Sequence, residues 1–205
     1  MRPNSDKDLI FQIPTEEGHI QSQQLRRLFP DPIDGAALDE RGKIMGFFNK
    51  LFGKSADQLC APVAGQAVPV SEVPDPTFSE GILGDGIAIK PTDGKVCAPC
   101  DATVDMMFTT GHAVSLVTEF GAEILIHVGL ETVSLEGKHF PIHAQNGEKV
   151  KKGQLLIEVD MAAVEAEGFN TITPMLVCNS ADFSTFKTMT GKTVTTADPV
   201  IELAK

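Results

Sequence analysis

Two histidines, His112 and His127, are the residues of this chain whose type and spacing best suit chemistry. They lie on either side of the turn-like segment Thr118-Glu119-Phe120-Gly121, and both flanks show period-two alternation. Such alternation around a short glycine-containing loop predicts an antiparallel β-hairpin. Folding about Glu119 and Phe120 places His112 opposite His127, and opposed side chains on one face have Cβ atoms roughly 4.5–5.5 Å apart. This register brings two imidazoles together, whereas a slip of one residue sends them to opposite faces.

Paired imidazoles can supply a nucleophile, a proton carrier or metal ligands near neutral pH. One ring could attack phosphorus while the other hydrogen-bonds the transferred phosphoryl oxygens. Thr110, two residues before His112, adds a hydroxyl that could fix the tautomer of a neighbouring ring. A single histidine among apolar residues is more often a structural side chain. For the pair, the structural and the chemical interpretations both remain open.

The overall composition indicates a globular protein. The chain has 205 residues, 42% of them hydrophobic and 22% charged, which suits one domain of ordinary size plus a tail. A net charge of −11 disfavours nucleic acid as a partner and suits a basic protein. We expect a cytoplasmic location, because no apolar run approaches the roughly 20 residues of a membrane span and the N-terminus lacks signal-peptide features.

The chain divides into three parts by composition. Residues 1–44 are rich in charge, Gln and Pro, and we expect a disordered or non-native N-terminal extension, with Met45 as a candidate true start. Residues 45–59 form an amphipathic segment and linker. Its phenylalanines and lysines, within 45–54, could contact an anionic membrane surface weakly, at the inner face of the membrane. Residues 60–205 form the main domain.

The main domain shows a β pattern. Short apolar alternations are interrupted every 8–12 residues or so by Pro, Gly and Asp, which predicts an all-β fold, an antiparallel sandwich or barrel. Short helices are expected only at Met161–Glu167 and Ser180–Met189. Cys97 and Cys100 form a C-x-x-C, but no second such pair exists, and we favour two small buried residues over a redox or zinc site.

Several blocks of sequence together resemble a known family. In chain order they are Pro69–Asp75, Gly84–Pro91, Gly111–Ala113, Leu125–Val133 and Thr171–Pro174. They are similar to the glucose-type IIA proteins of the bacterial phosphoenolpyruvate-dependent sugar phosphotransferase system, over about Cys60 to Lys205. The resemblance implies a β-sandwich of the duplicated hybrid type, with the histidines in a shallow apolar depression.

The resemblance also implies roles for individual residues. His127 would accept a phosphoryl group from the phosphohistidine of HPr and pass it to a cysteine on the IIB domain of a glucose-type sugar permease. His112 would assist, and Thr110 would hydrogen-bond within the pair. No cofactor is required, although Zn²⁺ at His112 and His127 is an option. The rim of the depression, which would meet the partner proteins, would comprise Phe78, Ile82, Leu83, Leu125 and Val133, with Asp75 and Glu131 as acidic positions facing basic residues of HPr.

Two alternative functions remain open from the sequence. A zinc hydrolase of the lysostaphin type needs a His-x-His and a His-x-x-x-Asp. Here His112 is followed four residues on by Leu116, and His127 by Glu131. A regulatory protein that docks other targets through its acidic face is compatible with the carrier function.

Overall fold

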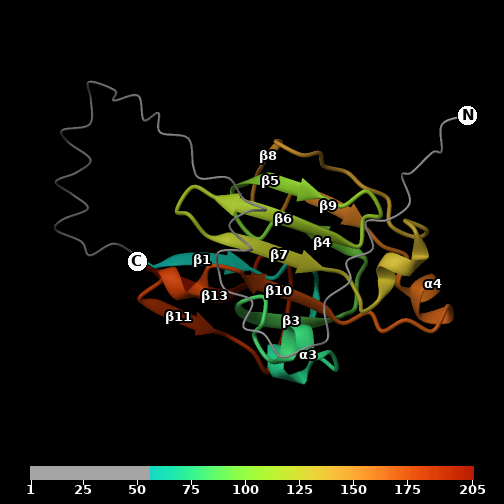
Figure 1. The fold of residues 1–205 in the computed structure, drawn as a ribbon, viewed down its shortest axis with the longest axis horizontal. Helices are drawn as coiled ribbons and strands as arrows, with labels where there is room; N and C mark the ends of the chain where they lie inside the picture. The colour runs from blue at the N-terminus through green and yellow to red at the C-terminus, as the bar shows by residue number, and fades with distance from the viewer. Residues whose placement is uncertain (1–55) are drawn as a thin grey trace, which may run out of the picture. The chain divides into compact units, whose positions relative to one another are not determined.

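The computed structural model describes residues 56–205, and Figure 1 shows the arrangement of their strands and helices. The expectations for residues 1–44 and for the amphipathic segment 45–54, including its membrane contact, lie outside the described residues.

Three antiparallel sheets make up the described part of the chain. In spatial order the eight-stranded sheet contains β12 (Lys192–Val194), β2 (Gly65–Pro69), β3 (Asp85–Pro91), β10 (Thr173–Val177), β7 (Glu123–His127), β6 (Ala113–Thr118), β5 (Ala102–Met107) and β8 (Lys149–Val150). The three-stranded sheet contains β1 (Asp57–Cys60), β13 (Pro199–Ala204) and β11 (Thr185–Thr188), and the two-stranded sheet contains β4 (Lys95–Cys97) and β9 (Leu155–Glu158).

The helices among residues 56–205 are short. They are α3 (Pro76–Ser79), α4 (Met161–Ala166) and the 3₁₀ turns η1 (Val70–Glu72), η2 (Thr132–Leu135) and η3 (Ser180–Asp182). An antiparallel β-sandwich with a few short helices is therefore confirmed.

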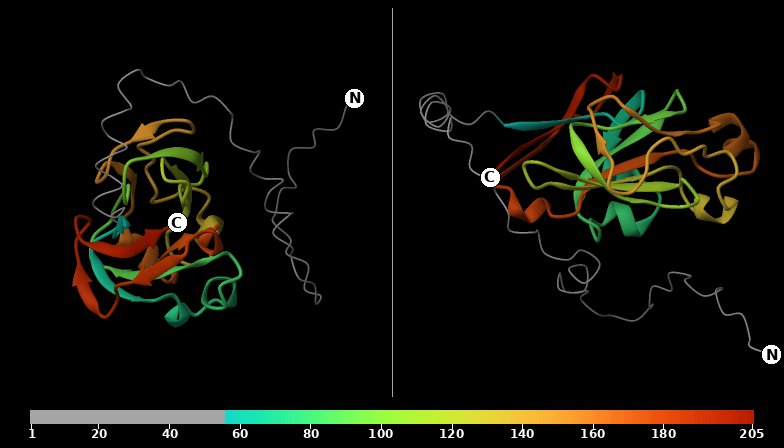
Figure 2. Two further views of the ribbon diagram at one scale, coloured as in Figure 1. Left: turned by 90° about the vertical axis from the view of Figure 1, so that its left-hand side faces the viewer. Right: turned by 90° about the horizontal axis from the view of Figure 1, so that it is seen from above.

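One main hydrophobic core contains residues from all three sheets. Figure 2 shows how the strands of these sheets are arranged in two further views. Val114 and Leu116 of β6 and Ile124 and Ile126 of β7 all point into it. Because side chains alternate along a strand, the outer face of this hairpin carries the remaining residues, including Leu125 and His127 at the end of β7.

A second apolar cluster lies on the neighbouring strands of the same sheet. The helix α3 and the turn η1 lie over β3 and β10, where Phe78 packs with Ala88 and Leu176. Asp75 starts α3 by accepting a hydrogen bond from the Thr77 backbone N–H at 2.8 Å, and Pro76 occupies the first helical position, where its fixed φ suits a helix. This cluster ends beside His127, so α3 supplies one wall of the site.

Some sequence-based expectations need correction. The segment Ser180–Met189 is not a helix: only η3 is helical, and β11 then pairs with β13 along Thr185–Thr188, a run whose threonines and phenylalanine favour strands. The helix expected from Met161 is confirmed as α4, with Asp160 as its N-cap. Cys97 and Cys100 are buried as expected, and burial raises the pKa of the Cys100 thiol to about 12.

Candidate functional site

The two histidine rings lie together at one end of the β6–β7 hairpin. His127 is the last residue of β7, and His112 immediately precedes β6. Their ring centroids are 5.1 Å apart and the ring planes meet at 72°, edge to face. His112 is buried, at 7% exposure, whereas His127 is half-buried and reaches the surface.

The expected hairpin register was wrong by one residue. Ala113, not His112, lies opposite His127. The rings still meet because His112 stands outside the regular strand, where strict alternation no longer fixes the direction of a side chain. Gly111 provides the bend: its φ is +63°, and a Cβ there would lie 2.7 Å from the Phe140 carbonyl oxygen.

A backbone carbonyl sets the tautomer of His127. The ring Nδ1 lies 2.8 Å from the Gly129 carbonyl oxygen, which can only accept, so Nδ1 carries the proton and donates it. In the neutral ring Nε2 is then left with a free electron pair. Sequence reasoning missed this carbonyl, because a backbone acceptor has no residue type of its own, although glycine at 129 is a visible signal.

Thr110 and His112 form the predicted contact. The Thr110 hydroxyl oxygen lies 2.5 Å from His112 Nδ1. When this hydroxyl donates the bond, neutral His112 carries its proton on Nε2. The two rings then differ: one offers a lone pair at Nε2 and the other an N–H donor. This combination suits attack on a centre whose oxygens need a hydrogen-bond donor.

Each histidine also contacts a phenylalanine ring. Phe78 of α3 lies 5.2 Å from His127, and Phe108 lies 5.2 Å from His112, as measured between ring centroids. Sequence reasoning placed Phe78 at the site but missed Phe108. Its position at the end of an expected strand, four residues before His112, could have drawn attention to it.

Burial keeps both imidazoles neutral at pH 7. Removal from water lowers the pKa of His112 to about 4, with a smaller contribution from the neighbouring His127. Burial likewise lowers the pKa of His127, while the Gly129 carbonyl and the Asp75 carboxylate act in the opposite direction. A neutral imidazole keeps the electron pair that a nucleophile needs.

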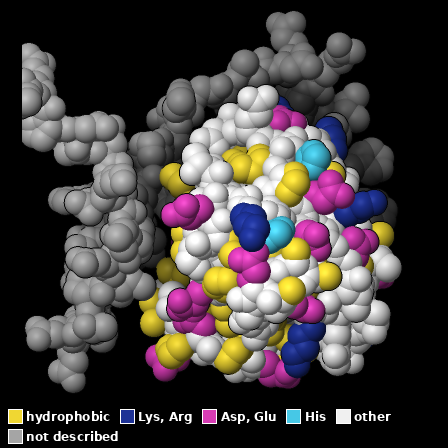
Figure 3. Space-filling model, turned by 90° about the vertical axis from the view of Figure 1, so that its right-hand side faces the viewer, with side chains coloured by type: hydrophobic (Ala, Val, Ile, Leu, Met, Phe, Trp, Pro, Cys, Tyr) yellow, Lys and Arg dark blue, Asp and Glu magenta, His cyan; other side chains and the backbone are white. Residues whose placement is uncertain are grey.

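The expected rim residues lie in and after α3, in β7, and in the segment from Glu131 through η2 that follows β7. Phe78 is buried, Leu83 and Leu125 are half-buried, and Ile82 and Val133 are 52% and 53% exposed. Asp75 is half-buried at the start of α3, and Glu131 is exposed in the loop that follows β7. Exposed apolar side chains beside acidic ones suit a protein-docking surface. Acidic side chains also lie among hydrophobic ones on the face shown in Figure 3.

A closed metal centre does not form among residues 56–205, where no group of three or more His, Cys, Asp or Glu residues is arranged to hold an ion. His112 and His127 would supply two of the four ligands that zinc usually takes, and a carboxylate from a partner protein would have to contribute another. The other histidines of this region pair separately, His139 with Glu167 and His143 with Glu158. A three-ligand hydrolase centre therefore has no counterpart here.

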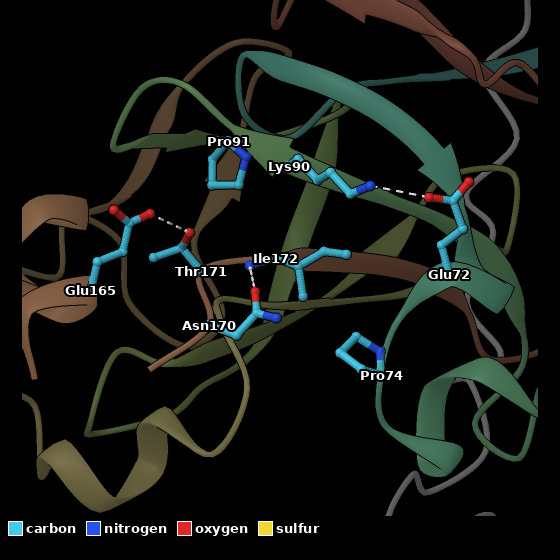
Figure 4. A pocket seen from close by; sticks show the side chains of 8 residues that line it. All are labelled: Glu72, Pro74, Lys90, Pro91, Glu165, Asn170, Thr171 and Ile172. Atoms are coloured by element: carbon cyan, nitrogen blue, oxygen red, sulfur yellow. Dashed lines mark hydrogen bonds and ion pairs between the residues drawn. The ribbon is translucent and has the colours of Figure 1, made fainter. Parts of the chain in front are cut away.

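Neither histidine of the pair lines a separate pocket of about 350 Å³ (Figure 4). Its lining residues are Glu72, Pro74, Lys90, Pro91, Glu165, Asn170, Thr171 and Ile172. Most of its polar side chains already pair with one another or with nearby backbone, as Lys90 does with Glu72 at 3.1 Å and Thr171 with Glu165 at 3.0 Å. The histidine pair is therefore the stronger candidate for chemistry.

Comparison with known proteins identifies the family. A sequence model described as the phosphoenolpyruvate-dependent sugar phosphotransferase system, EIIA 1, matches residues 57–183. The chain belongs to this family. It is 41% identical over 152 residues to the glucose-specific EIIA component of Bacillus anthracis, an alignment that covers 72% of this chain and 92% of the relative. It is 37% identical over 166 residues to the Haemophilus influenzae glucose-specific EIIA component, covering 78% of this chain and all of the relative.

Two further matches extend this result. The glucose permease IIA structure from Mycoplasma capricolum superposes with a TM-score of 0.68 at 31% identity, covering 74% of this chain and 97% of that one. A β-glucoside-specific EIIBCA component from Dickeya chrysanthemi is 41% identical over 147 residues, but this chain spans only 23% of its length. The chain is thus a glucose-type EIIA component, a part of the phosphotransferase system that carries phosphoryl groups. None of the helices in residues 56–205 is long and apolar enough to span a bilayer.

Proposed function

We propose that Nε2 of His127 accepts a phosphoryl group from the phosphohistidine of HPr and passes it to a cysteine of the IIB domain of a glucose-type sugar permease. The Dickeya relative carries a IIA region in one polypeptide with IIB and IIC parts, which supports a IIB domain as the acceptor. Since both partners work at the cytoplasmic side of the membrane, this function implies the same location for the carrier.

The observation that carries the proposal is the hydrogen bond from His127 Nδ1 to the Gly129 carbonyl oxygen. It leaves the Nε2 electron pair free to form the new N–P bond, while the N–P bond of the donor breaks and its electron pair returns to the donor imidazole. In the second step a cysteine thiolate of the IIB domain attacks phosphorus, the S–P bond forms, and the Nε2–P electron pair returns to His127. No hydrolytic water enters either step.

His112 is positioned to assist the second transfer, from His127 to the IIB cysteine. With Thr110 donating to its Nδ1, the Nε2–H of His112 can donate to a phosphoryl oxygen. Such a donor stabilises charge on the transferring group without bonding to phosphorus. The phenylalanine rings beside the pair exclude water, which protects a high-energy N–P bond from hydrolysis.

The partner proteins would dock on the rim. Ile82, which follows α3, and Val133, in η2, provide exposed apolar contact surface. Asp75 and Glu131 supply negative charge that would attract a basic donor protein and orient it.

Phosphorylation from phosphoenolpyruvate tests the proposal. Incubated with enzyme I, HPr and labelled phosphoenolpyruvate, the protein should take up phosphate that is labile in acid and stable in base. His127→Ala should remove the label, whereas His143→Ala, at an exposed histidine outside the pair, should keep it. Label retained in His127→Ala would reject the assignment.

A further inference from the structure

The turn that follows β7 determines where the Gly129 carbonyl points. Gly129 has a φ of +74° and Glu131 a φ of +59°, so two of its residues adopt left-handed backbone. A non-glycine residue in that region costs of order 1 kcal/mol or more and persists only when its surroundings hold it. Side chains that hold this turn therefore control the hydrogen bond to His127.

Thr132 is the buried side chain that holds it. Its exposure is 0%, and its hydroxyl donates to the Val128 carbonyl oxygen at 2.6 Å. Val128 makes a second hydrogen bond, in which its backbone N–H donates to the His112 carbonyl oxygen at 2.7 Å. Val128 is thus tied both to the segment that carries His112 and to Thr132.

The methyl group of Thr132 packs close to Gly129 and leaves no room for a side chain there. A Cβ added at Gly129 would lie 2.7 Å from Thr132 Cγ2 and 2.9 Å from the Asn170 carbonyl oxygen. The same Asn170 oxygen accepts a hydrogen bond from the Leu130 N–H at 2.8 Å. Because that N–H and the Gly129 carbonyl belong to one peptide plane, the carbonyl is directed away from Asn170 and accepts from His127.

We propose that Thr132 is a positioning residue for phosphoryl transfer: it holds the Val128–Glu131 turn so that the Gly129 carbonyl keeps the proton of His127 on Nδ1. The effect on phosphoryl transfer rests on the proposed function. The effect of Thr132 on the tautomer of His127 does not depend on that function. Thr132 touches neither phosphate nor partner, and it acts through two backbone groups.

The matched substitutions are Thr132→Val, which keeps the shape and removes the hydroxyl, and Thr132→Ser, which keeps the hydroxyl. Thr118→Val is the control. Thr118 is also buried, and its hydroxyl oxygen accepts from the Ala122 N–H at 2.8 Å, at the opposite end of the same hairpin. ¹⁵N NMR of the histidine rings at pH 8 measures the tautomer, and labelling from phospho-HPr measures the transfer rate.

We expect wild type, Thr132→Ser and Thr118→Val to show His127 protonated at Nδ1 only. Thr132→Val should show both tautomers and about tenfold slower phosphorylation, the effect of losing roughly one hydrogen bond. A pure Nδ1–H tautomer in Thr132→Val, or mixed tautomers in Thr118→Val, would overturn the proposal. If Thr132→Val does not fold, Thr132→Ala is measured by the same criteria. If wild-type His127 takes up no phosphate while the tautomers behave as expected, the positioning role stands and the carrier function fails.

Discussion

The rings of His112 and His127 meet edge to face, with centroids 5.1 Å apart, although the hairpin does not pair these two residues. Ala113 is the cross-strand partner of His127, and His112 reaches the site from the turn before β6. The contact therefore depends on the bend at Gly111 rather than on sheet register. One ring is fixed by a carbonyl and the other by a hydroxyl, so the two rings can play different parts.

Replacing His112 by glutamine should separate acceptance of phosphate from its delivery. Nε2 of His127 remains available, so His112→Gln should still take up label from phospho-HPr. Delivery to a IIB domain should slow by roughly tenfold to a hundredfold, because a hydrogen bond to charge that develops in the transition state is lost. A coupled sugar-phosphorylation assay with excess enzyme I and HPr measures delivery. Rates for His112→Gln equal to those of a His143→Gln control would argue against an assisting role.

The buried histidines should make the protein less stable in weak acid. Burial holds the pKa of His112 at about 4, below its ordinary value of 6.5, so the unfolded chain binds a proton more readily than the folded one. This stabilising contribution is complete above pH 6.5 and is lost as the pH falls towards 4. The difference between the two pKa values corresponds to about 3 kcal/mol in total, of which about 2 kcal/mol is lost by pH 5.

Urea unfolding at pH 7.5 and pH 5.0 checks this expectation. Other groups also titrate in this range, so the decisive quantity is the difference between wild type and His112→Gln. The variant should lose about 2 kcal/mol less than wild type between the two pH values. Identical pH dependence in both proteins would show that His112 is not held neutral by burial.

The sequence predicted the sandwich and the chemical pair because both depend on side-chain types. Period-two alternation on both flanks of the loop predicts the hairpin, and Val114, Leu116, Ile124 and Ile126 of that hairpin enter the core. The predicted register is wrong by one residue because the turn is centred on Phe120, not between Glu119 and Phe120. In the structure His127 pairs with Ala113, one residue away from the expected partner His112. The two rings still meet because His112 lies outside the strand.

Other parts of the site had weaker signals. The helix α3 has four residues, too few to show a helical period, although Asp75 followed by Pro76 is a typical helix start. The segment at Ser180 suggested a helix by composition, but pairing with β13 prevailed from Thr185. The Gly129 carbonyl and the packing of Phe108 on His112 depend on tertiary structure and could not be read from residue types alone.

Gly129→Ala should damage both stability and phosphorylation. Its φ of +74° disfavours any side chain, and a Cβ would lie within 3 Å of Thr132 and of the Asn170 carbonyl oxygen. We expect a loss of about 2–3 kcal/mol in the free energy of unfolding, from strained backbone plus overpacking, together with strongly reduced labelling of His127.

Gly147→Ala is the matched control for that experiment. Gly147 has a similar φ of +78°, but no atom lies within 4 Å of the position of an added Cβ. Gly147→Ala should lower the free energy of unfolding by only about 1 kcal/mol, the cost of placing alanine at a positive φ, and it should leave phosphorylation intact. Equal losses of stability for the two variants would mean that contacts of Gly129 with its neighbours contribute little.

Thr110→Val should weaken delivery through the tautomer of His112. Valine has the shape of threonine but cannot donate to Nδ1, so the proton of neutral His112 would no longer be held on Nε2. We expect slower transfer to the IIB domain by about tenfold, with normal acceptance from phospho-HPr, and Thr110→Ser should restore most of the rate. If Thr110→Val delivers phosphate as fast as wild type, the contact between Thr110 and His112 has only a structural role.

The acidic rim should increase the rate of phosphorylation by electrostatic attraction. Asp75→Asn keeps the helix cap, since asparagine caps helices as well as aspartate does, and Glu131→Gln keeps the size of the side chain. The double variant should accept phosphate from phospho-HPr severalfold more slowly at low salt. The deficit should shrink as salt rises, because the screening length falls from about 10 Å at 0.1 M to about 3 Å at 1 M. Glu119→Gln, at the far end of the hairpin, is the control and should leave the rate nearly unchanged. A deficit that persists undiminished at 1 M salt would indicate a direct contact or an altered site in place of long-range attraction.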